Sequence, residues 1–299
     1  MFDIYAAVTD RIIAELESGN IPWQKPWTGV TTGAIKRSDG RPYSLINQIL
    51  LGKPGEWMTY KGAQQAGGNV KKGAKGSMVV FWKMLKRDIK DDNGNIVKDE
   101  NGIPKPKFIP VLKYYTVFHI DDCEGIEPKW TKENLPTTAS ADEKADAIID
   151  DYSARANLKI THEEQDKAFY MPRRHIVKLP LIEQFADTSE YYSTTFHELV
   201  HSTGHKTLLN RFDGKAANAA FGSEEYSKEE LVAEIGACGI LNEIGMETHS
   251  SFRNSAAYIQ SWIRQLKNDK RLIISAASRA EKAIKLILNI TDDNAQATA

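Results

Sequence analysis

Residues 191–205, YYSTTFHELVHSTGH, decide the fold expected for the C-terminal half of this chain. Their apolar pattern predicts a helix, which places His197 and His201 on one face, one turn apart. Two neutral imidazoles at that spacing can bind a single Zn²⁺, and Glu198 between them can act on a water molecule. HExxH also arises by chance, as incidental histidines on a helix face, so the surrounding sequence has to be weighed with it.

A catalytic zinc needs a third protein ligand, and a later predicted helix, residues 227–245, offers two acids one turn apart. In the class with two histidines and one glutamate, a later helix supplies the glutamate, and a further acid hydrogen-bonds the outer nitrogen of a ligand histidine. We predict that Glu230 binds the metal and that Glu234 is the further acid. The alternative is that Glu234 binds the metal and Glu230 faces solvent.

The residues after the motif exclude the metzincin pattern HExxHxxGxxH. Gly204 matches that pattern and allows the chain to turn away, but Thr207 stands where the last histidine would be. His205 comes two residues too early, and it is a surface residue, a hydrogen-bond donor to the transition state or a substitute ligand. The motif therefore predicts a zinc-dependent metallopeptidase that uses two histidines and one glutamate.

The expected mechanism follows from these parts. Zinc lowers the pKa of its bound water to about 7, and Glu198 takes a proton as the water attacks a carbonyl. The strand HIVKLP, residues 175–180, is a candidate edge for aligning an extended peptide. Candidate hydrogen-bond donors to the oxyanion are His205, Tyr191, Tyr192 and Tyr226.

Composition places the chain among ordinary globular proteins, because 41% of its 299 residues are hydrophobic and 26% are charged. Two distant cysteines, Cys123 and Cys238, predict neither a disulfide framework nor a cysteine-based zinc site, which fits a reducing cytosol. The acidic N-terminal helix, ending near Gly19, argues against a signal peptide, and no apolar run of about 18 residues predicts a membrane span. We therefore expect a cytoplasmic protein with no membrane partner.

Charge is unevenly distributed along the chain. Between Lys25 and Lys90 lie 13 basic residues and three acids, whereas the whole chain has a formal charge of −1. Basic residues interleaved with aromatic rings suit single-stranded DNA, since cations track phosphates and rings stack on bases. The other interpretation is core packing for the rings and simple solvation for the lysines. The candidate DNA-binding residues are Trp23, Lys25, Trp27, Arg41, Tyr43, Lys61, Lys71, Lys72, Lys75 and Trp82.

The order of helix and strand signals predicts an α+β protein in two parts. Residues 1–125 are expected to form a small α+β domain that binds single-stranded DNA. This domain includes two Asn-Gly turns in a hairpin excursion at 91–107. Residues 126–140 are polar and carry two prolines, which predicts a linker. Residues 141–299 are expected to form a mainly helical zincin-like metallopeptidase domain with a short antiparallel sheet.

Motifs in both halves resemble one known family. PWQKPW (22–27), RPYSLIN (41–47), 56–83 and YYTVFHIDDCEG (114–125) resemble the N-terminal domain of ArdC-type antirestriction proteins. Residues 191–211, followed by EELVAEIGA (229–237), resemble the zincin-like domain of the same family. The resemblance implies a protein of plasmids, phages or other mobile elements that binds single-stranded DNA and protects incoming DNA from host restriction. It also implies His197, His201 and Glu230 as metal ligands and Glu198 as the catalytic residue.

Two positions depart from the pattern of the family. Ser202 stands where an aromatic residue is usual, and His175 stands where Asp is common.

The zinc motif and the basic N-terminal half leave three hypotheses open. The first is a single-stranded-DNA-binding protein that cleaves an unidentified protein. The others are a DNA-binding shield with structural or vestigial zinc, and an intracellular zinc peptidase without DNA binding.

Overall fold

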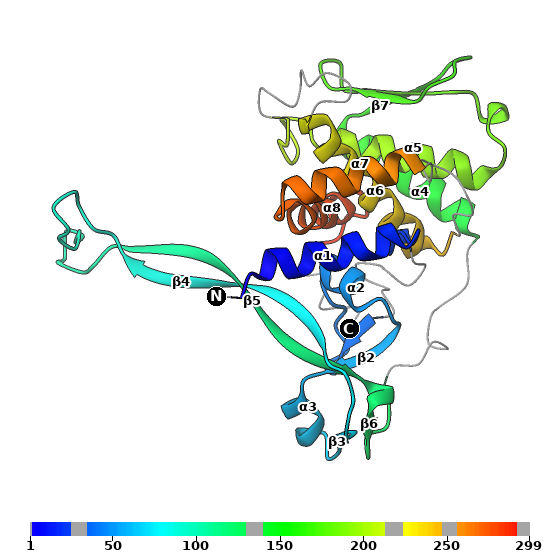
Figure 1. Ribbon diagram of the computed structural model, residues 1–299. Coiled ribbons are helices and arrows are strands. Elements are labelled where there is room, and N and C mark those ends of the chain that lie inside the picture. The colour runs from blue at the N-terminus through cyan, green and yellow to red at the C-terminus, as the bar shows by residue number, and fades with distance from the viewer. Residues whose placement is uncertain (1, 25–34, 130–139, 213–223, 247–255, 292–299) are drawn as a thin grey trace.

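The computed structural model describes residues 2–24, 35–129, 140–212, 224–246 and 256–291. Figure 1 shows a body of packed helices, a smaller region of strands beside it and one long hairpin that extends away from both. The mixed α+β class predicted from the sequence is confirmed, as is the mainly helical C-terminal part.

The helices predicted at the N-terminus, over 191–205 and over 227–245 are all present, with bounds shifted by a few residues. Asp3 caps the first helix by accepting a hydrogen bond from the amide of Ala6, and Ser140 and Glu143 form a capping box at the start of α4. The described helices are α1 (Ile4–Glu17), α2 (Leu45–Leu51), α3 (Tyr60–Gln65), α4 (Ala141–Ala156), α5 (Thr188–Ser202), α6 (Glu224–Ile244), α7 (Ala256–Asn268) and α8 (Leu272–Ile287). Three short 3₁₀ turns accompany them: η1 (Pro22–Gln24), η2 (Ile120–Asp122) and η4 (Ile182–Gln184).

The strands of the described residues form three sheets. A four-stranded sheet has the order β1-β2-β5-β4, in which β1 and β2 are parallel and the other pairs antiparallel. The remaining sheets have the orders β3-β6 and β7-β9-β8. The strands are β1 (Ile35–Arg37), β2 (Gly55–Met58), β3 (Asn69–Val70), β4 (Ser77–Asp88), β5 (Pro106–His119), β6 (Cys123–Glu124), β7 (Lys159–His162), β8 (Phe169–Met171) and β9 (Ile176–Leu179).

Two expectations about the short C-terminal sheet are wrong. It is mixed rather than antiparallel, because β9 pairs in parallel with β7 and antiparallel with β8. The strand within 175–180 is also not an edge, since the β8–β9 hairpin folds β9 back between β7 and β8 and occupies both of its sides. An extended peptide therefore cannot add to β9. Within the described residues, the edge strands of this sheet are β7 and β8.

The long hairpin consists of β4 and β5, paired in register from Ser77↔Val117 to Asp88↔Pro106. Its tip carries the two predicted Asn-Gly turns, in which Asp91 and Asp99 each accept backbone hydrogen bonds from residues two and four positions later. Gly94 and Gly102 adopt positive φ angles of 85° and 76°, a conformation that glycine tolerates without steric cost. The turn chemistry therefore specifies the tip locally.

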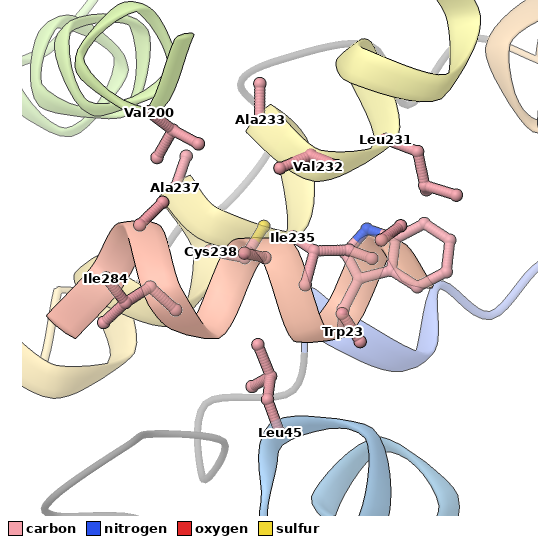
Figure 2. Close-up of a cluster of buried hydrophobic side chains, with 14 of the residues drawn as sticks. Trp23, Leu45, Val200, Leu231, Val232, Ala233, Ile235, Ala237, Cys238 and Ile284 are labelled. Carbon is pink, nitrogen blue, oxygen red and sulfur yellow. The ribbon is translucent and has the colours of Figure 1, made fainter. Parts of the chain in front are cut away.

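One large hydrophobic core joins the two halves of the chain. Figure 2 shows part of this cluster, in which Trp23 and Leu45 lie among residues of α6 and α8. The ring of Trp23 also packs edge-on against that of Trp262 in α7, with centroids 5.3 Å apart. The residues on either side of the predicted 126–140 linker thus bury apolar surface against each other. Residues 130–139 of that segment lie outside the described residues, and the division into domains stays a prediction.

Candidate metal centre

Helix α5 presents the HExxH motif from the interior of the protein. Asp187 caps the helix through a 2.8 Å hydrogen bond from the Glu190 amide, and Phe196, Leu199 and Val200 on its buried face are fully enclosed. His197 is likewise buried, and the side chain of His201 is 13% exposed. Packing of the apolar face therefore fixes the rotation of α5 about its axis, and this rotation sets where His197 and His201 lie.

The predicted ligand atoms converge. One ligand atom each from His197, His201 and Glu230 lies within 4.8 Å of the others. The two imidazole Nε2 atoms are 3.1 Å apart, and the Glu230 oxygens lie 3.5 Å from Nε2 of His197 and 3.3 Å from Nε2 of His201. Two imidazole nitrogens and one carboxylate are a donor set that suits zinc and neighbouring divalent transition metals. The residues present thus fit a metal ion.

Close packing of α5 and α6 brings Glu230 to the histidines. Gly236 on α6 faces Val200 on α5, and a Cβ atom at Gly236 would lie 2.8 Å from one Val200 methyl carbon and 2.9 Å from the other. Only a glycine lets the two helices approach this closely without a shift. The position of Glu230 therefore depends on a helix contact one and a half turns further along α6.

Glu234 lies behind His197, on the side away from the other ligand atoms. Its carboxylate oxygen is 3.8 Å from Nδ1 of His197, longer than a hydrogen bond. Burial raises the pKa of the Glu234 carboxyl to about 7, and a 3.5 Å hydrogen bond from the Gln24 amide acts in the opposite direction. Gln24 belongs to η1, so the N-terminal half contributes directly to the surroundings of the candidate metal centre.

Sequence reasoning missed a second acid beside the ligands, Glu229. Its carboxylate lies 3.6 Å from Nδ1 of His201 and receives hydrogen bonds from Arg211 at 2.6 and 3.2 Å. Burial alone raises the pKa of Glu229, but the interactions with His201 and Arg211 outweigh it and leave the pKa below its ordinary value. Arg211 also donates to the Val200 carbonyl and the Thr203 hydroxyl at the end of α5. No local pattern indicates this cluster, because Arg211 reaches it from a loop.

Two other predicted site residues, Glu198 and His205, are not among the converging ligand atoms. Glu198 is buried within α5. The His205 ring stacks on that of His175 at 4.2 Å and its Nδ1 contacts the Thr207 hydroxyl, so His205 is outside the ligand group. Burial lowers the pKa of His205, and the neighbouring His175 lowers it further.

The tyrosines proposed as oxyanion donors have other contacts. The Tyr192 hydroxyl donates to Asp146, and the Tyr191 hydroxyl contacts Nε2 of His162. The side chain of Tyr226 lies outside the described part of the structure. The two described hydroxyl groups are therefore engaged elsewhere.

The turn after α5 has a different cause from the one predicted. Gly204 does not adopt a positive φ angle. Instead, a Cβ atom there would lie 2.5 Å from the ring of Phe212, which in turn stacks on Tyr170 of β8. Gly204 is therefore needed for close packing. A positive φ angle, 52°, is found at His175 in the β8–β9 turn, a conformation that Asp, Asn and His adopt more readily than other non-glycine residues.

The candidate DNA-binding residues are scattered over the N-terminal half. The expectation is not supported for Trp23 and Tyr43, because Trp23 is 1% exposed in the shared core and Tyr43 is 6% exposed. Arg41 pairs with Asp39 at 2.7 Å, and Trp82 is 49% exposed. Lys25 and Trp27 lie outside the described residues. Four further lysines are exposed on α3 and the segment after β3: Lys61, Lys71, Lys72 and Lys75.

Comparisons with known proteins match each half. Residues 2–118 match the N-terminal domain of anti-restriction factor ArdC, and residues 143–279 match a zincin-like metallopeptidase family. Two Escherichia coli proteins named DNA primase TraC are 38% and 36% identical over 94% and 95% of this chain, which spans 26% and 20% of their lengths. The uncharacterized protein y4eC of Sinorhizobium fredii is 31% identical over 94% of this chain and 90% of its own length.

Solved structures agree with these matches. The metal-free crystal structure of the antirestriction protein ArdC from plasmid R388 has a TM-score of 0.71 and 37% identity, with 99% of both chains covered. The Mn(II)-bound structure of that protein has a TM-score of 0.73 and 36% identity, over 96% of this chain and 98% of the other. Fold and site therefore define a protein with a zincin-like metallopeptidase domain. The chain belongs to the ArdC family of antirestriction proteins.

Proposed function

We propose that this chain is a zinc-dependent metallopeptidase that binds single-stranded DNA and protects the DNA of a mobile element against restriction. The convergence of His197, His201 and Glu230 within 4.8 Å carries the peptidase part of the proposal. Family membership supports the antirestriction role, since the R388 relative carries that name.

In this proposal, His197, His201 and Glu230 hold the metal ion. A bound zinc ion would polarise a peptide carbonyl and lower the pKa of a water molecule to about 7. Glu198 accepts a proton from the attacking water and passes it to the leaving amine. Glu234 and Glu229 lie 3.8 and 3.6 Å from the outer nitrogens of His197 and His201, where each carboxylate would orient a ring on approaching to hydrogen-bond distance.

A protein substrate would be held in extended form by the sheet beside α5. Among the described residues β8 is an edge of that sheet and contacts α5, so its outer side is the candidate template for an added strand. Phe169 of β8 is exposed and gives the edge an apolar contact. The substrate itself is an unidentified protein.

Single-stranded DNA binding is supported by exposed cations and aromatic rings in the N-terminal half. Lysines on α3 and after β3 can contact phosphates, and Trp82 offers a ring to a base. In the described part of the chain, no helix combines the length and apolar composition needed to cross a bilayer.

The variant Glu198→Gln tests the catalytic part, because it retains the three proposed ligands and removes the base. We expect Zn²⁺ binding to persist and peptide hydrolysis to be lost. If protection of incoming DNA is retained when hydrolysis is lost, protection does not depend on proteolysis, and the DNA-binding shield is favoured over a protease as the source of protection. In a matched pair, Glu230→Ala should abolish tight Zn²⁺ binding and Glu234→Ala should only weaken it; the reverse order would assign the third ligand to Glu234.

A further inference from the structure

A cavity of about 430 Å³ lies where the long hairpin joins the helical body, and the metal centre does not use it. Its walls come from β4 and β5, from α2 and the segment before it, and from α8. Its volume falls within the roughly 300–1,000 Å³ range of small-molecule sites. The cavity therefore has room for a compact ligand, and both halves of the chain line it.

One wall is the open edge of β4. At Val80 this edge is already paired, because the Asn47 side chain both donates to the Val80 carbonyl and accepts from its amide, each at 2.8 Å. Alternate residues of a strand direct their backbone groups to the same side. The amide and carbonyl of Trp82 therefore face the cavity, and they offer one donor and one acceptor in a plane.

Aromatic rings surround this edge. Trp82 and Phe81 are 49% and 43% exposed, and the Phe81 ring contacts that of Tyr115 with centroids 5.6 Å apart. Exposed rings beside backbone hydrogen-bonding groups are the two elements by which proteins hold an unpaired base. A purely apolar ligand would leave the backbone groups unsatisfied.

Charge selects an anionic ligand. The lining includes three cations, Arg37, Lys282 and Lys285, and one acid, Glu281. Glu281 accepts a 3.0 Å hydrogen bond from the Leu45 amide at the start of α2, and it lies 3.6 Å from Lys285. The acid is thus engaged in joining α8 to α2, and the lining retains a net positive charge.

We propose that this cavity binds one nucleotide of single-stranded DNA, with the base against Trp82 and the phosphate beside Lys282 and Arg37. The inference rests on the proposed DNA-binding function and extends it, because α8 belongs to the helical half of the chain. DNA bound here would contact both halves at once.

The test is equilibrium binding of a fluorescein-labelled dT20 oligonucleotide by the full chain, followed by anisotropy over a series of salt concentrations. Lys282→Ala should weaken binding and reduce the slope of log K against log salt by about 0.7, the value for one phosphate contact on a single strand. The matched control is Arg279→Ala, an exposed cation on the same helix that does not line the cavity. Trp82→Ala should weaken binding roughly 5- to 100-fold, and Trp82→Phe should retain most of the affinity.

The outcomes separate this inference from the function on which it rests. If the unsubstituted protein binds dT20 and Lys282→Ala behaves like Arg279→Ala, the cavity does not hold a nucleotide, although DNA binding stands. If Trp82→Ala alone binds normally, the base is not stacked there. If the unsubstituted protein does not bind dT20 at any salt concentration, the proposed DNA-binding function itself fails.

Discussion

Substitution of Gly236 by alanine should weaken metal binding without touching any ligand. The added Cβ would lie 2.8 and 2.9 Å from the two methyl carbons of Val200, whereas carbon atoms pack best at about 3.5–4.0 Å. Rotation of Val200 relieves little, because both methyl groups are in contact and a valine in a helix strongly prefers one rotamer. The helices α5 and α6 therefore have to separate by roughly 0.6–1.2 Å, which is the difference between these distances.

The expected magnitudes follow from that separation. Overpacking costs about 1–3 kcal/mol, and the better helix propensity of alanine offsets about 1 kcal/mol of it. The larger effect falls on the metal, since the Glu230 oxygens lie only 3.3–3.5 Å from the imidazole nitrogens and metal sites tolerate about 0.2 Å of error in ligand distances. We expect Zn²⁺ affinity to fall about 10- to 100-fold, similar to the loss of a group that orients a ligand.

The matched control is Gly239→Ala, three residues further along α6. Its Cβ would meet the terminal carbon of Ile284 on α8 at 2.5 Å, so this variant overpacks the other face of the same helix. Zn²⁺ affinity would be measured by competition with a chromophoric chelator, and the free energy of unfolding of the metal-free proteins by urea titration. Equal Zn²⁺ affinity of Gly236→Ala and the unsubstituted protein would refute the reasoning, as would an equal loss in both variants.

Three further experiments test the supporting structure. Arg211→Ala leaves the buried carboxylate of Glu229 without its cation and should reduce the free energy of unfolding by about 3–5 kcal/mol in urea titration; an unchanged midpoint would contradict the pairing. Tyr152→Phe removes the 2.9 Å hydrogen bond to the Ser202 hydroxyl and should cost about 0.5–1.5 kcal/mol. A double-mutant cycle with Ser202→Ala checks that value, and additive losses would argue against the bond. Trp23→Ala should cost about 3–5 kcal/mol by opening the core, whereas Trp23→Phe should leave oligonucleotide affinity unchanged, and a loss of affinity would show that the ring binds DNA.

The parts of the fold that sequence predicts are those with local causes. Caps, the left-handed glycine after α2 and the Asp-x-Asn-Gly turns at the hairpin tip act within a few residues, so they are visible in the sequence. The pairing of β9 has no such cause, because its partners are set by how the β8–β9 hairpin folds against β7. The short helix α3 was missed for a related reason, since its two turns hold a glycine and depend on the Thr59 cap.

The candidate metal site likewise combines residues whose placement has a local cause with residues placed by tertiary packing. His197 and His201 are one helical turn apart, so their convergence requires only that α5 forms. Glu230 requires in addition that α6 packs on α5, which its apolar run indicates. The contact between Arg211 and Glu229 requires a loop to fold back across both helices, and no spacing in the sequence encodes that. For Trp23, residue type alone could not distinguish a stacking ring from a core ring.

The shared hydrophobic core connects the part of the chain proposed to bind DNA with the part that carries the candidate metal centre. The two family matches end and begin at residues 118 and 143, yet Trp23 and Leu45 from the first are packed among residues of α6 and α8 from the second half of the chain. From the same N-terminal segment, Gln24 reaches Glu234 behind the proposed metal ligand His197. In the other direction, α8 lines the cavity at the base of the β4–β5 hairpin. Helix α8 also packs against α5 and α6, and close-packed interiors transmit strain, so we expect a displacement of α8 to change the surroundings of the proposed nucleotide cavity and of the candidate metal centre together. The two matched ranges are separate in sequence, but each contributes residues to the candidate site that lies mainly in the other.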